Sequence, residues 1–263
     1  MKKLGLIGGV AAISCLTAGT ASADNIRPLD TGNLTQLSSV FSNIGSSLNA
    51  VNDQTGIAYF NPQSSTTTVQ NLFFENPFAG WINSNTFGIY SAADPTKKLQ
   101  VFAGTDSAVT TNAVQFIPGG TVQLLGQSST AVSGFGLTFG FYLTNGAGQT
   151  FFSDDALNPG GNPQAFVYKA KGDNVNLYEA GDGVAGCQNT GGIGCVSDAN
   201  HWYVAFEDLE YAAGSDRNFS DLMVSIESIT PVPEPGSMVL LGSGLFAVAT
   251  AARRRFRKAA TAA

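Results

Sequence analysis

Apolar side chains recur at alternating spacings of three and four residues in one segment near the beginning of the chain. These positions fall on one face of a helix, because an α-helix has about 3.6 residues per turn. Serine and asparagine occupy most of the other face, so segment 24–50 is predicted to contain a short amphipathic helix. The apolar positions are Leu34, Leu37, Phe41, Ile44 and Leu48.

After Val51 the period of the apolar positions changes to two, which is typical of strands. Stretch 134–144 places alternating apolar residues on one face, and stretch 113–126 predicts two strands around a Pro-Gly-Gly turn. Segment 63–70 is polar and is predicted to be a loop or a sheet edge. Two further hairpins are predicted, one from 164–170 and 174–180 around Lys171–Asp173, and one from 201–209 and 221–229.

Short strands, few strong helix formers and 31 glycines favour an all-β architecture. The fold class predicted is mainly β: an antiparallel β-sandwich or jelly-roll-like domain over residues 51–230. A short N-terminal helix precedes this domain, and a C-terminal apolar helix follows it.

The first 23 residues have the features of a secretory signal peptide. Lys2 and Lys3 precede an apolar run over 4–16, and Ala21 and Ala23 flank a serine in the pattern that signal peptidase cuts. The mature chain is therefore expected to begin after Ala23. Cys15 raises the alternative of a lipoprotein, but the usual leucine three positions earlier is replaced by alanine.

The C-terminal segment 231–258 combines three features in a fixed order. Val232, Pro233, Glu234 and Pro235 come first, and residues 237–252 then form an uncharged stretch. As a helix this stretch spans about 24 Å, which is short of the ~30 Å hydrocarbon core of a bilayer. A basic cluster follows, and the positive-inside rule keeps it in the cytoplasm. It contains Arg253, Arg254, Arg255, Arg257 and Lys258.

A plain membrane anchor is one interpretation of this tail, but Pro-Glu-Pro, apolar helix and arginine cluster together resemble the PEP-CTERM sorting signal of Gram-negative bacteria. The resemblance implies that an exosortase-type membrane protease cuts near Pro-Glu-Pro. It also implies a transient inner-membrane anchor through the C-terminal helix, followed by delivery to the cell surface or the extracellular space. Prolines at 231, 233 and 235 keep the segment out of helices and strand ladders, which makes it accessible to a protease.

The exported part is strongly acidic. Without Glu234 and the seven cations of the two ends, residues 24–230 retain 6 basic and 18 acidic residues, a net charge of −12. Such a surface repels nucleic acid and anionic lipid and favours divalent cations. Nucleic-acid binding is therefore excluded.

Cys187 and Cys195 are the only cysteines of the exported part. In an oxidising compartment they are predicted to form a disulfide around a tight loop. A zinc site would require more thiols or imidazoles, and His201 is the only histidine of the chain.

Catalytic motifs are absent from the sequence, which contains no G-x-S-x-G, H-E-x-x-H or phosphate-binding glycine loop. His201 stands at an expected strand start and is predicted to be an ordinary, partly buried histidine. Adjacent carboxylates such as Asp154 and Asp155 point to opposite faces of a strand, so they do not form an acid–base pair. The chain is therefore predicted not to be an enzyme.

The densest polar cluster lies at the mouth of the hairpin predicted at 201–229. Like charges that face each other across a sheet require a bridging group, which here is either Arg217 or a Ca²⁺ ion. An EF-hand is excluded, because position 6 of that template is Asp221 and not glycine. The candidate Ca²⁺ ligands are Glu207, Asp208, Asp216, Asn218 and Asp221.

Residues Phe151–Ile229 also resemble an uncharacterised bacterial surface-domain family that ends in F-E-D-L, a glycine-bearing loop and D-x-D-[FY]-N-D. Asn218 and Ser220 depart from this pattern, since an aspartate and an asparagine are usual there. The loss of a carboxylate would weaken a cation site. The family implies no activity.

These features together predict an exported surface or extracellular-matrix protein with a structural or adhesive role in extracellular polysaccharide or a biofilm. The alternative is a carbohydrate-binding module that presents Trp81 or Trp202 to a polysaccharide.

Overall fold

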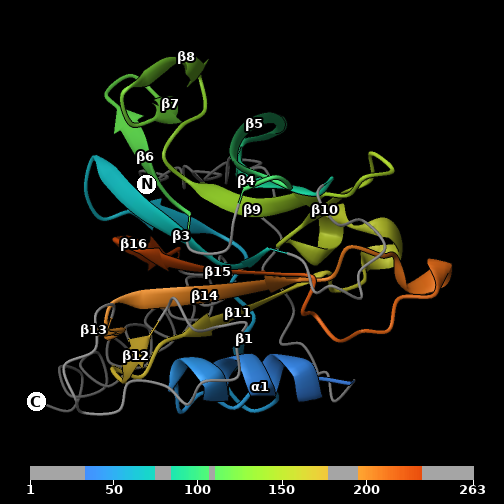
Figure 1. Cartoon of the computed structure of the whole chain (residues 1–263). Helices are drawn as coiled ribbons and strands as arrows, with labels where there is room; N and C mark the ends of the chain where they lie inside the picture. The colour runs from blue at the N-terminus through green and yellow to red at the C-terminus, as the bar shows by residue number, and fades with distance from the viewer. Residues whose placement is uncertain (1–32, 75–83, 107–109, 177–194, 233–263) are drawn as a thin grey trace, which may run out of the picture.

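The computed structural model describes residues 33–74, 84–106, 110–176 and 195–232, and these residues form a β-sandwich with one helix on its outer face. Figure 1 shows helix α1 (Thr35–Ile44) beneath one sheet, and a second sheet stacked on the opposite face of that sheet. All strand pairs described are antiparallel. The predicted fold class is thus confirmed for the sandwich and the N-terminal helix, while the C-terminal apolar helix lies outside the described residues.

The larger sheet has eight strands, and its central strands β14 and β15 form a hairpin that the sequence predicts. Its order is β1 (Gln54–Thr55), β11 (Ala165–Lys169), β14 (His201–Phe206), β15 (Leu222–Glu227), β3 (Thr66–Phe74), β6 (Thr111–Ile117), β7 (Thr121–Leu124) and β8 (Gln127–Val132).

The smaller sheet has six strands, of which β10 (Thr150–Phe152) pairs with β9 outside the main path. The order of the others is β16 (Ile229–Pro231), β2 (Phe60–Pro62), β9 (Phe139–Thr144), β4 (Thr86–Ser91) and β5 (Asp94–Ala103). A separate pair is formed by β12 (Asn174–Asn176) and β13 (Cys195–Ser197). Short 3₁₀ turns occur at Asp155–Leu157, Pro159–Gly161 and Tyr211–Ala213.

The central strands are covered on both faces, and successive side chains therefore enter two different cores. In β14, Trp202 and Val204 point into the core between the two sheets. Tyr203 and Ala205 point the other way, into the core beneath helix α1. This double burial explains why the β14 sequence is apolar at almost every position and does not alternate.

Helix α1 packs on the larger sheet through its apolar face, as its spacing predicts. The ring of Phe41 is fully buried and makes edge-to-face contacts with Tyr168 and Tyr203, at centroid distances of 5.0 and 5.8 Å. The helix ends at Gly45, which adopts a left-handed conformation with φ 84° that glycine accepts without strain.

Two predictions are wrong. Residues 66–70 belong to β3, which lies inside the sheet between β15 and β6, and not at an edge. β11 does not pair with β12 but with β1 and β14. The reason lies in Asp198, whose carboxylate accepts from the N–H of Gly172 while its own N–H donates to the carbonyl of Asp173. These bonds turn the chain toward β13 after Lys171.

Stretch 134–144 follows the prediction only in part. Phe139, Phe141 and Leu143 of β9 enter the core between the sheets, whereas Leu137 precedes the strand and is 58% exposed. The hairpin of β6 and β7 forms around the Pro-Gly-Gly turn as expected.

Candidate acidic site

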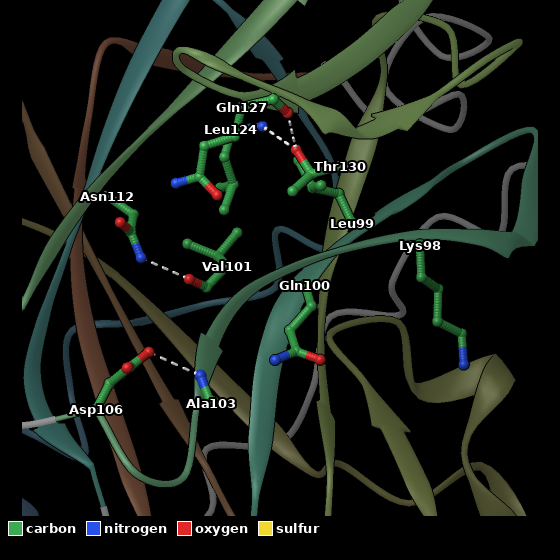
Figure 2. Close-up of a pocket in the computed structure, with 10 residues that line it drawn as sticks. All are labelled: Lys98, Leu99, Gln100, Val101, Ala103, Asp106, Asn112, Leu124, Gln127 and Thr130. Carbon is green, nitrogen blue, oxygen red and sulfur yellow. Dashed lines mark hydrogen bonds between the residues drawn. The ribbon is translucent and has the colours of Figure 1, made fainter.

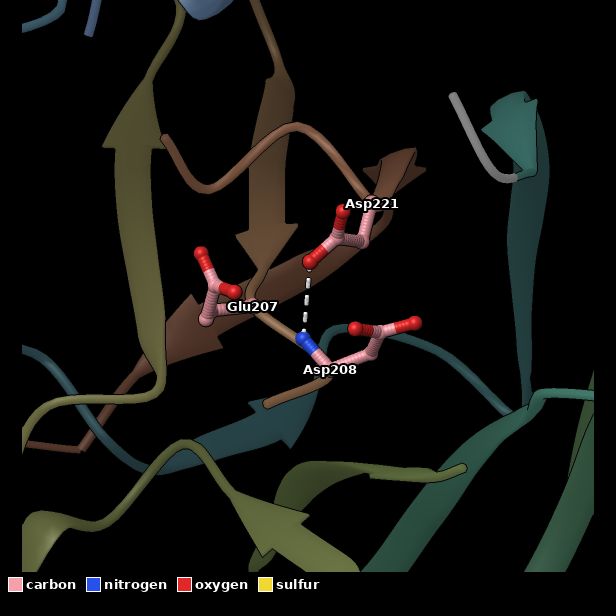
Figure 3. A group of neighbouring side chains, drawn as sticks. All are labelled: Glu207, Asp208 and Asp221. Atoms are coloured by element: carbon pink, nitrogen blue, oxygen red, sulfur yellow. Dashed lines mark hydrogen bonds between the residues drawn. The ribbon is translucent and has the colours of Figure 1, made fainter. Parts of the chain in front are cut away.

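Three carboxylates converge where the hairpin of β14 and β15 opens. Glu207 and Asp208 directly follow β14, and Asp221 directly precedes β15. The pairing of Phe206 with Leu222 brings these chain positions together, as expected from the sequence. Figure 3 shows the three side chains around the end of β14.

All three side chains are buried, with exposed fractions of 1% for Glu207, 2% for Asp208 and 5% for Asp221. One carboxylate oxygen from each lies within 4.8 Å of the other two. The N–H of Asp208 donates to Oδ2 of Asp221 at 2.8 Å, which fixes the carboxylate of Asp221 against the end of β14. The result is a compact set of hard oxygen atoms in the protein interior.

Asparagines from the second sheet close one side of this cluster. Nδ2 of Asn85, which directly precedes β4, donates to Oδ2 of Asp208 at 2.9 Å. Nδ2 of Asn145, which directly follows β9, donates to the carbonyl of Asp208 at 2.9 Å. Asp208 therefore links the hairpin of the larger sheet to two strands of the smaller sheet.

The protein environment disfavours the charged form of each carboxylate. Burial raises the pKa of Glu207 to about 7, and the charge of Asp216 adds to this effect. Burial raises the pKa of Asp221 to about 9, with the neighbouring charges of Glu207 and Asp208 as further causes. The pKa of Asp208 is also raised by burial. The metal-free cluster therefore binds protons more readily than carboxylates in water do.

The structure brings together only three of the five candidate ligands. Nδ2 of Asn218 donates to Oδ2 of Asp216 at 2.7 Å and to Oε1 of Gln36 in helix α1 at 3.2 Å. Asp216 influences the cluster through its charge on Glu207, and Asn218 binds the loop to the helix. The guanidinium of Arg217, the alternative bridging group, lies 4.6 Å from the centroid of the Tyr211 ring.

Gln164 is a member of this site that sequence analysis does not identify. Its carbonyl accepts from the N–H of Glu207 at 3.0 Å, which extends the ladder of β11 and β14 by one residue. Its side chain is fully buried, and neither Oε1 nor Nε2 has a hydrogen-bond partner among the described residues. No local signal in the sequence marks this glutamine, because its neighbour Glu207 is far away along the chain.

The remaining candidate residues do not form an accessible site. His201 Nδ1 lies 2.8 Å from Oγ of Ser225, and Nε2 lies 3.5 Å from a carboxylate oxygen of Glu227. This resembles a nucleophile–base–acid arrangement, but Ser225 is only 2% exposed, so a substrate does not reach its hydroxyl. Burial lowers the pKa of His201, and the nearby charge of Glu227 opposes this shift.

Trp202 is 5% exposed and packs edge-to-face on Phe60 at 5.1 Å, so it does not offer a stacking surface to a sugar ring. Trp81 lies outside the described residues.

A pocket of about 520 Å³ opens elsewhere, between β5 and the strands β6 to β8 (Figure 2). Gln100, Gln127 and Lys98 contribute polar side chains to its lining, whereas Asp106 and Asn112 bond to the backbone of Ala103 and Val101. No aromatic residue is among those that line it. Its chemistry is that of a polar surface pocket without a stacking platform.

Several sequence predictions concern residues outside the described ranges: the signal peptide, Cys187, and the sorting motif from Pro233 onward. Cys195 begins β13, but its predicted pairing with Cys187 stays a prediction. Within the described part of the chain, no helix is long and apolar enough to cross a membrane.

Comparison with known families supports the interpretation of the C-terminal segment. Residues 231–255 match the PEP-CTERM protein-sorting motif. This motif implies export, transient anchoring in the membrane, processing by an exosortase-type membrane protease and delivery to the cell surface. No curated protein and no solved structure matches the chain.

Proposed function

We propose that this protein, which carries a PEP-CTERM sorting signal and is exported through it, is a structural or adhesive component of the extracellular matrix. The observation that carries the proposal is the placement of the chemically versatile side chains. Trp202, His201 and Ser225 contribute to packing and internal bonds and do not line an open cleft. This placement supports a structural role over a catalytic one.

Binding of a soluble saccharide is the second candidate function, and the pocket between β5 and β8 favours it. Amide side chains such as those of Gln100 and Gln127 form hydrogen bonds with sugar hydroxyl groups. Without an aromatic platform, however, such a pocket lacks the stacking that dominates binding of polysaccharide chains.

The two functions predict different effects of deleting the gene and of changing the pocket residues. We expect deletion of the gene in the native bacterium to reduce the cohesion of the matrix, and the wild-type gene to restore it. The pocket variant Gln100→Ala/Gln127→Ala should restore cohesion equally well. A glycan array with the mature protein should show no specific ligand. Specific glycan binding that the pocket variant abolishes would favour the binding module, and unchanged cohesion after deletion would contradict the structural role.

A further inference from the structure

We propose that Glu207, Asp208, Asp221 and the side-chain carbonyl of Gln164 form a Ca²⁺ site at the mouth of the β14–β15 hairpin. The site requires no contribution from the pocket between β5 and β8, so it stands independently of the function proposed above. Its role is to hold together the two sheets and the 209–220 loop, which is bonded to helix α1.

The spacing of the carboxylates fits a calcium ion. Ca²⁺ binds oxygen at 2.3–2.6 Å, so two ligand atoms on opposite sides of the ion are about 4.6–5.2 Å apart. The three oxygens here lie within 4.8 Å of one another, and a single Ca²⁺ ion can therefore contact all of them. Mg²⁺ retains several of its waters and demands near-ideal octahedral geometry, so a set of buried protein oxygens suits Ca²⁺ better. The ligands are all oxygens, which also disfavours zinc and copper.

Gln164 supplies an independent indication of a ligand. A buried amide without hydrogen bonds costs free energy, and native proteins therefore satisfy such groups with protein, water or an ion. The Gln164 side chain is fully buried, and both of its polar atoms are without a partner among the described residues. A ligand at this position would satisfy the amide oxygen.

The position of Gln164 in the pleat places its side chain on the same face of the sheet as that of Glu207. Along β11, Phe166 and Tyr168 enter the core beneath helix α1, and Gln164 is two residues before Phe166 on the same face. Glu207 is two residues after Ala205, which enters the same core. Cross-strand neighbours on one face have Cβ atoms about 4.5–5.5 Å apart, so the side chains of Gln164 and Glu207 begin next to each other.

A cation at this position would stabilise the connection between several elements. It would neutralise carboxylates whose mutual repulsion and burial otherwise oppose ionisation. Asp208 is already bonded to Asn85 and Asn145 of the smaller sheet, and the 209–220 loop is bonded to Gln36 of helix α1. The ion would thus crosslink both sheets and the helix at one end of the sandwich.

Calorimetric titration of the mature protein, purified from cells that express the full chain, tests the proposal directly. After treatment with EDTA and buffer exchange, CaCl₂ should bind at one ion per chain with a Kd on the order of 10⁻⁴ to 10⁻³ M. MgCl₂ should bind at least tenfold more weakly. In thermal unfolding, 10 mM CaCl₂ should raise the midpoint by about 3–10 °C relative to EDTA.

Matched variants separate a ligand role from a merely structural one. Glu207→Gln and Asp221→Asn should weaken Ca²⁺ binding at least tenfold without lowering the unfolding midpoint in EDTA. Gln164→Met should also weaken binding, while its midpoint in EDTA should stay equal or rise, because a buried amide without partners is removed. The control Asp198→Asn changes a buried carboxylate outside the cluster. It should retain the Ca²⁺-dependent rise in the midpoint and the wild-type affinity for Ca²⁺.

The wild-type titration keeps the proposal falsifiable even if a variant fails to fold. No heat of binding and equal midpoints in EDTA and CaCl₂ would overturn the proposal. It would also be overturned if Glu207→Gln and Asp221→Asn retained the wild-type affinity for Ca²⁺.

Discussion

The charge of Glu207 should destabilise the metal-free protein, and its removal should therefore be stabilising. The substitution Glu207→Gln retains the size of the side chain and an oxygen that can accept from the N–H of Phe219, as Oε2 does at 3.4 Å. It eliminates the charge that faces Asp208, Asp216 and Asp221. In EDTA at pH 8 we expect the free energy of unfolding to increase.

The magnitude follows from the pKa of Glu207, which rises from 4.5 to about 7 in the folded protein. At about 1.4 kcal/mol per pKa unit, ionisation of this buried group opposes folding by about 3 kcal/mol. Asp221, whose pKa is raised to about 9, relieves part of this repulsion when it is protonated, so Glu207→Gln should stabilise by about 1–3 kcal/mol. For a domain of this size, the unfolding midpoint should rise by roughly 3–10 °C.

The same shift fixes the pH dependence. Because the pKa is higher in the folded than in the unfolded protein, the unfolded chain loses this proton first as the pH rises. Wild-type stability should therefore fall between pH 4.5 and about 7, and the contribution should be lost above that range. Glu207→Gln lacks this term, so the two proteins should unfold alike near pH 4 and diverge toward pH 8.

The assay is differential scanning calorimetry of both proteins in EDTA across pH 4 to 8. A variant that is less stable than wild type at pH 8, or a difference that does not change with pH, would refute the reasoning. The first result would mean that the folded protein stabilises the ionised Glu207 carboxylate, and the second that folding does not shift the pKa of Glu207.

Three further predictions concern other parts of the chain. The mature protein should end near Pro235 and lack the arginine cluster, and an intact mass that still includes residues 253–255 would contradict this. Non-reducing peptide mapping should recover Cys187 and Cys195 in one crosslinked peptide, whereas a free-thiol signal from the exported protein would exclude the bridge. Phe41→Ala should destabilise the protein by about 3–5 kcal/mol in chemical unfolding, because its buried ring packs on Tyr168; a loss below 1 kcal/mol would show that helix α1 contributes little.

Sequence patterns predict those helices and strands whose apolar side chains all lie on one face of the element. The 3–4 spacing around Phe41 predicts helix α1 because that helix buries a single stripe. The β14–β15 hairpin is predictable as well, and with it the approach of Asp208 to Asp221. Nearness of two chain positions in a hairpin follows from local pairing alone.

The remaining features depend on neighbours that are far away along the chain. β3 begins with three threonines and resembles a polar loop, but its pairing with β15 and β6 places it inside the sheet. The hairpin predicted around Lys171 does not form, because Asp198 bonds to Gly172 and Asp173 and directs the following strand to β13. Gln164 becomes part of the acidic site only because β11 and β14 pair. The spacing of apolar residues within one segment carries no information about which distant strand that segment will pair with.

The position of β16 has a mechanical consequence for release of the protein. This strand pairs with β2 up to Pro231, and the N–H of Val232 donates to the carbonyl of Tyr59. Only Pro233 and Glu234 lie between Val232 and Pro235. Three residue-to-residue steps therefore span at most about 11 Å at ~3.6 Å each. A protease that cuts near Pro235 would therefore act within about 11 Å of the folded β-sandwich. If β16 dissociated from β2 at the sheet edge, the unpaired segment before Pro235 would lengthen by several residues. The stability of the β16–β2 pairing therefore determines how closely the protease must approach the folded domain.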